Sequence, residues 1–173
     1  MRIIIREINS ETRIYKSAEL VRGSFRTVAN DFNLTKENCP THPSFISDKQ
    51  LFELHERGLW FFGLFVNENQ TGFVAVEKSD ATTYYMEKLA VVPNARHSGY
   101  GETLVRYTAD FAAGKGASKL SIGTIHEHSV LKEWYKTLGF VETGLKKFNH
   151  LPFTVCFMEK DLKEPNKEKN GYS

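Results

Sequence analysis

At 173 residues and 19.8 kDa, the chain has the length of one globular domain, which is enough to bury one hydrophobic core. Its content of 40% hydrophobic and 25% charged residues excludes collagen-like, low-complexity and wholly disordered proteins. The formal net charge is only +2, and the sequence shows no basic stripe, so we expect no nucleic-acid partner.

The sequence shows no pattern typical of a membrane or secreted protein. Its longest apolar run, residues 59–66, is well short of the roughly 20 residues that cross a bilayer. The segment after Met1 lacks the sustained apolar centre and cleavage site of a secretory signal. Cys39 and Cys156 are far apart and fit no zinc or redox spacing. We therefore expect a cytoplasmic protein with reduced thiols and no membrane partner.

The first predicted elements are a short Ile-rich strand at residues 2–8 and two helices. The first helix carries apolar residues at three- and four-residue spacings, namely Ile14, Ala18, Val21, Phe25 and Val28. The second begins with a capping box between Ser47 and Gln50 and ends near Gly58. The polar loop at 35–44 contains two prolines, and it is either a surface connection or a loop that shapes a substrate pocket.

From residue 60 onward, short strands are predicted at 60–66, 71–77 and 83–92, which indicates an antiparallel meander. Helices and strands then follow at 101–113, 119–125, 129–138, 140–147 and 154–161. The order β-α-α-β-β-β-α-β-α-β-β indicates an α/β protein with a mixed sheet (α+β) in one domain over residues 1–162. Residues 163–173 are polar and lack a core face, so we expect a disordered tail.

The most informative segment is the loop between the strand at 83–92 and the next helix. Gly99 and Gly101 lie at the helix start, where unpaired backbone N–H groups and the helix dipole favour a bound phosphate. A Cβ at either glycine would hold the phosphate oxygens away from the backbone. Glu102 stands where a Walker loop needs lysine, and Leu104 stands where a dinucleotide fingerprint needs a small residue. The remaining pattern is Arg-x-x-Gly-x-Gly after a strand that ends in Val-x-Pro.

This pattern resembles the Arg/Gln-x-x-Gly-x-Gly/Ala motif of the GCN5-related N-acetyltransferase (GNAT) superfamily, which holds the pyrophosphate of acetyl-CoA. Arg96, Gly99 and Gly101 stand at the motif positions. The resemblance extends over residues 1–162 and includes the order of the predicted elements.

A second family motif, Asn-x-x-Ala-x-x-x-Tyr-x-x-x-Gly-Phe, resembles residues 128–140, with matches at Tyr135, Gly139 and Phe140. His128 replaces the Asn of this motif, and Leu131 replaces the Ala. Two roles for His128 stay open: it replaces the Asn as a hydrogen-bond donor to the pantetheine arm, or it only caps the following helix.

The resemblance implies a GNAT fold with splayed fourth and fifth strands. It also implies direct transfer of an acetyl group from acetyl-CoA to a primary amine in a ternary complex, without a metal. The residues that it places at the cofactor are Leu89, Ala90, Val91, Arg96, His97, Ser98, Gly99, Tyr100, Gly101, His128 and Tyr135. The alternative function is a non-catalytic module that binds or senses acyl-CoA.

Two side chains are the candidate catalytic residues. Tyr135 is the candidate acid for the departing thiolate, although its apolar helix face is also typical of a core residue. Glu87 is the candidate base for the amine, directly or through water, or else an ion-pair partner of Lys88. The backbone N–H groups of residues 89–91 are the candidate oxyanion donors. Alternation predicts that one strand face carries Tyr85, Glu87, Leu89 and Val91.

The resemblance implies an acceptor pocket built from residues 20–55, 84–87 and 148–152. The carboxylates of this region would suit a cationic amine on a small molecule or a peptide, and they include Glu37, Glu53 and Glu56. Further residues that would face the acceptor are His42, His126 and Glu127. His126 and His128 have no third ligand at a useful spacing, so we expect no metal site. Dimerisation is common in the family, and a homodimer is compatible with the sequence.

Overall fold

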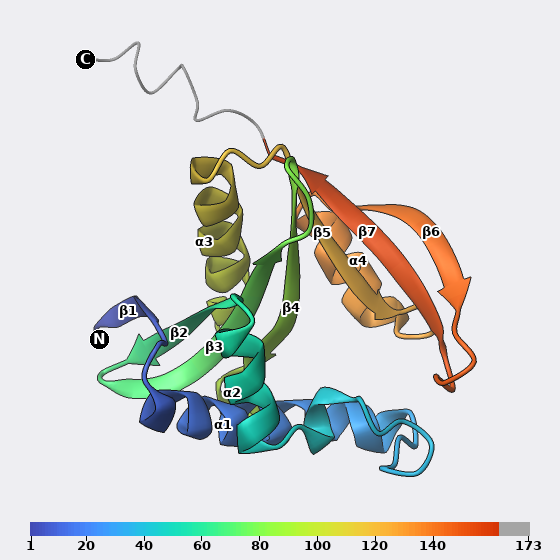
Figure 1. Ribbon diagram of the computed structural model, residues 1–173, viewed down its shortest axis with the longest axis horizontal. Helices are drawn as coiled ribbons and strands as arrows, with labels where there is room; N and C mark the ends of the chain where they lie inside the picture. Colours follow the sequence, from blue (N-terminus) through green and yellow to red (C-terminus); the bar gives the residue numbers. More distant parts are fainter. Residues whose placement is uncertain (163–173) are drawn as a thin grey trace.

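The computed structural model describes residues 1–162, which form a seven-stranded mixed sheet with helices on both faces (Figure 1). The strand order is β1-β2-β3-β4-β5-β7-β6. The strands are β1 (Ile3–Glu7), β2 (Trp60–Val66), β3 (Asn69–Lys78), β4 (Thr83–Val91), β5 (Lys119–Ile125), β6 (Val141–Lys147) and β7 (Thr154–Asp161). The helices are α1 (Glu11–Asp31), α2 (Asp48–Glu56), α3 (Tyr100–Gly114) and α4 (Ser129–Thr137), with 3-10 helices η1 (Pro43–Phe45) and η2 (Pro93–Ala95). The predicted disordered tail at 163–173 lies outside the described residues.

The predicted fold class is confirmed, and the predicted strands and long helices agree with the observed bounds to within two residues. The capping box of α2 is present, since Ser47 Oγ accepts the Gln50 N–H and Gln50 Oε1 accepts the Ser47 N–H. The two 3-10 helices were not predicted. No helix within residues 1–162 is both long and apolar enough to cross a membrane.

The sheet separates two apolar clusters. On one face, α3 and α4 cover a cluster that contains Leu64, Val74, Met86, Leu104 and Met158. On the other face, α1 and α2 cover a second cluster that contains Ile14, Val21, Leu51, Phe61 and Phe73. Of the predicted apolar stripe of α1, Ile14, Ala18 and Val21 are buried, whereas Phe25 and Val28 are half-buried.

Strands β4 and β5 are parallel and pair only at the start of each strand. Their register joins Thr83, Tyr84 and Tyr85 to Lys119, Leu120 and Ser121. Beyond these residues the two strands diverge, and Figure 1 shows the opening between them. The predicted splay of the fourth and fifth strands is confirmed, and it leaves β4 without a neighbour on its β5 side from Met86 onward.

A bulge in β4 overturns the prediction that four alternating residues share one face. Phe73 pairs with Ala90 whereas Ala75 pairs with Glu87, so β4 has one more residue than β3 in this interval. Lys88 takes a positive φ of 55° at the bulge. Glu87 consequently lies on the α1 face of the sheet, while Leu89 packs against the cluster on the α3 face. No glycine marks this bulge in the sequence.

Candidate active site

A cavity of about 800 Å³ extends through the opening between β4 and β5. Its walls are the second half of α1, the segment before and within η1, the outer half of β4, the start of α3, β5 and one side of α4. Thr41, His42 and Pro43 belong to this wall, and His42 is only 7% exposed. The loop at 35–44 therefore shapes a pocket, as one of its two interpretations predicted.

One end of the cavity has a row of unpaired backbone donors. The N–H groups of Ala95 and Arg96 bond to the carbonyl oxygens of Val92 and Pro93. Within residues 1–162, no hydrogen-bond acceptor is found for the six consecutive N–H groups of residues 97–102. Gly99, the N-cap of α3, has a φ of 84° and supplies no side-chain cap. These donors and the helix dipole make a site for an anion with several oxygens.

The two glycines of this loop have different structural roles. At Gly99 a Cβ would meet nothing within 4 Å, and the positive φ is what favours glycine. At Gly101 a Cβ would lie 3.3 Å from the Trp134 ring of α4. The expectation that a side chain at Gly101 would mainly displace bound oxygens is therefore incomplete, because the first contact is with Trp134.

Arg96 is held by the protein on three sides. Its Nη2 donates to the Ser24 carbonyl at 2.6 Å, its Nη1 to Thr27 Oγ1 at 2.9 Å, and its Nε to the Val91 carbonyl at 3.3 Å. The side chain thus joins the loop to α1 and to the end of β4. Because all three guanidinium nitrogens donate to protein oxygens, Arg96 would help to bind an anion mainly by positioning the loop and through its positive charge.

Two tyrosines lie in the central part of the cavity. Tyr135 projects from α4, is 7% exposed, and packs edge-on against Phe140. Burial raises its pKa well above the ordinary value, so the hydroxyl stays protonated near neutral pH. Burial, followed by the charge of Glu87, raises the pKa of Tyr85 to about 12. The Tyr85 hydroxyl lies 2.8 Å from where a Cβ at Gly123 would be, so a larger residue in β5 at this point would displace the tyrosine hydroxyl.

Glu87 lines the cavity and also contacts Lys88, with 3.6 Å between Oε2 and Nζ. Both interpretations of Glu87 thus have a structural basis. Sequence reasoning missed Glu77, which pairs with Tyr85 in the sheet register, on the same face as Glu87. Burial, followed by the charge of Glu87, raises the pKa of Glu77. The signal for this neighbour is the β3–β4 register, which depends on the turn between the two strands.

His128 caps α4, because its Nδ1 accepts the Leu131 N–H at 3.3 Å. It also lines the cavity and packs beside the ring of Phe32. Burial lowers its pKa. Capping occupies Nδ1, and Nε2 is the ring nitrogen that remains for a ligand.

Of the other residues expected to face the acceptor, some line the cavity and some do not. His42 lines the cavity, whereas Glu127 accepts the Thr154 backbone N–H at 3.0 Å. The acids Glu37, Glu53 and Glu56 are exposed and do not line the cavity. Within the described residues, the acids that do line it are Asp31, Glu87 and Glu102.

His126 belongs to a cluster that the sequence did not predict. Its ring, Glu142 and Cys156 bring one nitrogen, one oxygen and one sulfur within 4.8 Å of one another. The Lys132 ammonium already lies 2.9 Å from both His126 Nδ1 and Glu142 Oε1. Burial and the adjacent Glu142 raise the pKa of Cys156, which is not the thiolate that a metal needs. The lysine is therefore the cation of this cluster.

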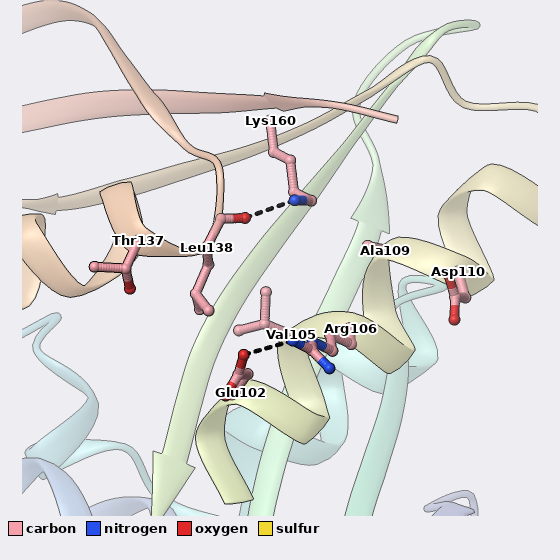
Figure 2. A pocket seen from close by; sticks show the side chains of 8 residues that line it. All are labelled: Glu102, Val105, Arg106, Ala109, Asp110, Thr137, Leu138 and Lys160. Carbon is pink, nitrogen blue, oxygen red and sulfur yellow. Dashed lines mark hydrogen bonds and ion pairs between the residues drawn. The ribbon is translucent and has the colours of Figure 1, made fainter. Parts of the chain in front are cut away.

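A smaller hollow of about 290 Å³ lies between α3, the end of α4 and β7 (Figure 2). Arg106 pairs with Glu102 across one helical turn, and Lys160 Nζ donates to the Leu138 carbonyl (Figure 2). These three charged groups therefore already have partners within the protein.

Comparisons with solved structures show the same fold in acetyltransferases. The chain is similar to PaiA N-acetyltransferase from Thermoplasma acidophilum in complex with coenzyme A, with 22% identity, coverage of 93% of this chain and 99% of that one, and a TM-score of 0.75. It is similar to the ribosomal-protein-S18-alanine N-acetyltransferase from Escherichia coli, with 14% identity, coverage of 96% and 97%, and a TM-score of 0.72. A GNAT family acetyltransferase from Elizabethkingia anophelis with acetyl-CoA bound matches with 18% identity, coverage of 92% and 98%, and a TM-score of 0.69.

No curated protein matches the chain at a significant level of sequence similarity. The sequence model of the acetyltransferase (GNAT) family matches residues 25–140. This range includes all of α4 and the loop of residues 97–102, which we call the anion-binding loop. This match covers most of the chain and agrees with the splayed sheet and the unpaired donors of residues 97–102. The chain belongs to the acetyltransferase (GNAT) family.

Proposed function

We propose that this acetyltransferase transfers the acetyl group of acetyl-CoA directly to a primary amine, in a complex that holds both substrates. The observation that carries the proposal is the row of six unpaired N–H groups at residues 97–102, beside the opening between β4 and β5. Pyrophosphate has the charge and the several oxygens that these donors require. The opening continues from this loop to Tyr135 and Glu87, so one cavity can take both the cofactor arm and an amine.

The end of β4 supplies backbone donors for the oxyanion of the transfer. The Val91 carbonyl accepts from Arg96 and not from β3, which indicates that it points toward the opening. Because the N–H and carbonyl of one strand residue point the same way, the Val91 N–H is available there too. Leu89 lies two residues earlier, after the bulge, and its N–H has the same direction. These donors support the role expected for residues 89–91.

The two candidate catalytic side chains line the same cavity. Tyr135 remains a neutral phenol, so its proton is available for the thiolate that leaves as the thioester breaks. Glu87 lines the cavity on the α1 side of the opening, and it can take the proton that the amine loses. Attack by the amine nitrogen forms the amide bond and breaks the carbon–sulfur bond, with no covalent enzyme intermediate.

The test is calorimetric titration with acetyl-CoA, CoA and NAD, followed by a thiol-release assay against a panel of primary amines. Binding of both CoA species but not NAD, with CoA release that depends on the amine, is the expected result. Binding without release by any amine would favour the non-catalytic acyl-CoA module instead. The absence of CoA binding would contradict the proposal as a whole.

A further inference from the structure

His42 is a buried donor that the transfer mechanism does not use. It lines the cavity where α1 and η1 meet, and we call this part of the cavity the acceptor end. Its Nδ1 faces Ser44. It accepts the Ser44 backbone N–H at 3.3 Å and lies 2.7 Å from the Ser44 hydroxyl oxygen. Since Nδ1 accepts the backbone N–H, the proton of the neutral ring resides on Nε2. The edges of Phe25 and Phe45 flank the ring and fix its orientation.

The Nε2–H of His42 has no hydrogen-bond acceptor within residues 1–162. In the same range, the one buried side-chain polar atom that lacks a partner is Ser24 Oγ. Nε2 is therefore not sealed in the protein but opens to the cavity that His42 lines. A donor that is fixed on its other edge and open toward a binding site is suited to a hydrogen-bond acceptor on a ligand.

The charges at this end indicate that the ligand's acceptor atom is uncharged. Lys88 pairs with Glu87, and all three guanidinium nitrogens of Arg96 donate to protein oxygens. Burial lowers the pKa of His42 to about 4, so the ring is neutral at pH 7. Asp31 also lines the cavity and would repel an anion. A carboxylate would lose water here without gaining a counter-charge, whereas a carbonyl oxygen needs only one donor.

Several apolar side chains also line the cavity. Phe25 and Val28 of α1 face the cavity together with Ile125, Phe153 and Val155. An amine with an apolar group adjacent to its polar atoms would bury that group here.

Resting on the proposed transfer to an amine, we propose that the acceptor is a primary amine with an apolar substituent and an uncharged carbonyl oxygen, which accepts the Nε2–H of His42. The α-amino amide unit has this chemistry, whether it is a small amino-acid amide or the first residue of a peptide. Free amino acids and amines without a carbonyl are the excluded classes. His42 is then a specificity-determining residue and not a proton carrier.

The test measures amine binding by calorimetry with CoA present, which requires no turnover. The probes are phenylalaninamide, 2-phenylethylamine and phenylalanine, with a Phe-initiated tetrapeptide amide to distinguish a peptide source from a small one. Wild-type protein should bind phenylalaninamide at least about tenfold more tightly than the other two single-residue probes, the value of one neutral hydrogen bond. Equal binding of phenylalanine or 2-phenylethylamine would overturn the proposal.

The matched variants are His42→Phe, which keeps an aromatic ring, and His42→Gln, which keeps a neutral N–H donor. His42→Phe should weaken phenylalaninamide binding by about tenfold and 2-phenylethylamine binding by less than about twofold, while His42→Gln should retain part of the preference. CoA affinity should remain unchanged in both. Equal losses for all amines would show a structural role for His42 and overturn the inference, while the transfer function stands if wild-type protein still releases CoA. Should the variants fail to fold, the wild-type preference alone decides.

Discussion

Arg96 Nη2 donates to the carbonyl oxygen of Ser24 at 2.6 Å, which joins the anion-binding loop to the middle of α1 across 72 residues of sequence. The same guanidinium also bonds Thr27 Oγ1 and the Val91 carbonyl. One side chain therefore joins the loop before α3 to α1 and to the end of β4.

Replacing Arg96 with alanine should destabilise the protein by about 1–3 kcal/mol, because three hydrogen bonds from a charged group are lost. Acetyl-CoA affinity should fall by about tenfold as the loop loses its support. The control is Arg106→Ala, since Arg106 is 76% exposed and makes one helical ion pair. Its expected cost is below about 0.5 kcal/mol. Chemical denaturation and calorimetry measure both effects, and equal effects of the two variants would refute this role for Arg96.

Gly99→Ala should cost about 1 kcal/mol and weaken acetyl-CoA binding, because alanine resists the φ of 84° that orients the unpaired N–H groups. No steric contact contributes, since a Cβ would meet nothing within 4 Å. Gly114→Ala is the matched control, because Gly114 also has open space but lies in α3 without a positive φ. That variant should be stabilised by about 0.5–1 kcal/mol. Unfolding curves that rank the two variants in the opposite order would count against the conformational argument.

Local patterns explain why most elements could be predicted from the sequence. The α1 stripe and the Ser47 capping box depend on residues within one or two turns, so their spacing was sufficient. The bulge at Lys88 could not be predicted, because a lysine takes the positive φ and the pairing with β3 determines it. Burial of His42 was likewise hidden, since one of its aromatic partners, Phe25, comes from α1.

In the site, too, features that depend on neighbouring residues in the sequence were predicted, and features that depend on tertiary contacts were not. The loop motif predicted the unpaired donors at 97–102, because a helix start produces them by geometry. It did not predict that Arg96 bonds α1, or that Glu77 joins Glu87 on one face, since both depend on tertiary packing. Sequence reasoning therefore predicted the loop at the start of α3 more completely than the part of the cavity that is lined by α1 and η1.

Tyr135→Phe should lower kcat by about 10²-fold while the affinity for acetyl-CoA changes little, because the phenol proton is lost and the ring packing is kept. Since burial raises the pKa of Tyr135, wild-type activity should not decline between pH 7 and 9 through loss of this proton. Tyr107→Phe, at a partly exposed tyrosine outside the cavity, is the control. Unchanged turnover in Tyr135→Phe would remove Tyr135 as the acid.

Glu87→Gln should reduce kcat/KM most at low pH and progressively less as the pH rises toward 9. The reason is that the neutral fraction of the amine grows about tenfold per pH unit below its own pKa, so a base matters less. Glu53→Gln, at an exposed glutamate outside the cavity, should leave the profile unchanged. Profiles of wild type and Glu87→Gln that run parallel over the whole range would assign Glu87 a structural or charge-pairing role with Lys88.

Acid should destabilise the protein partly through His42. Burial lowers its pKa from 6.5 to about 4 in the folded state. Between these two pKa values the unfolded chain binds a proton that the folded protein does not. The free energy of unfolding therefore falls as the pH drops from 6.5. Below about pH 4 both states bind the proton, and His42 causes no further loss. The full loss is at most about 3 kcal/mol.

His42→Gln should therefore flatten the fall in the free energy of unfolding between pH 6.5 and 4, measured by urea denaturation at each pH. Glutamine does not titrate, so the variant lacks the proton uptake that penalises the folded state. His150→Gln is the control, because His150 is exposed and should leave the pH dependence as in wild type. If His42→Gln loses stability with acid as steeply as wild type, His42 is not held neutral by burial. The Nε2–H donor assigned to it would then lose its support as well.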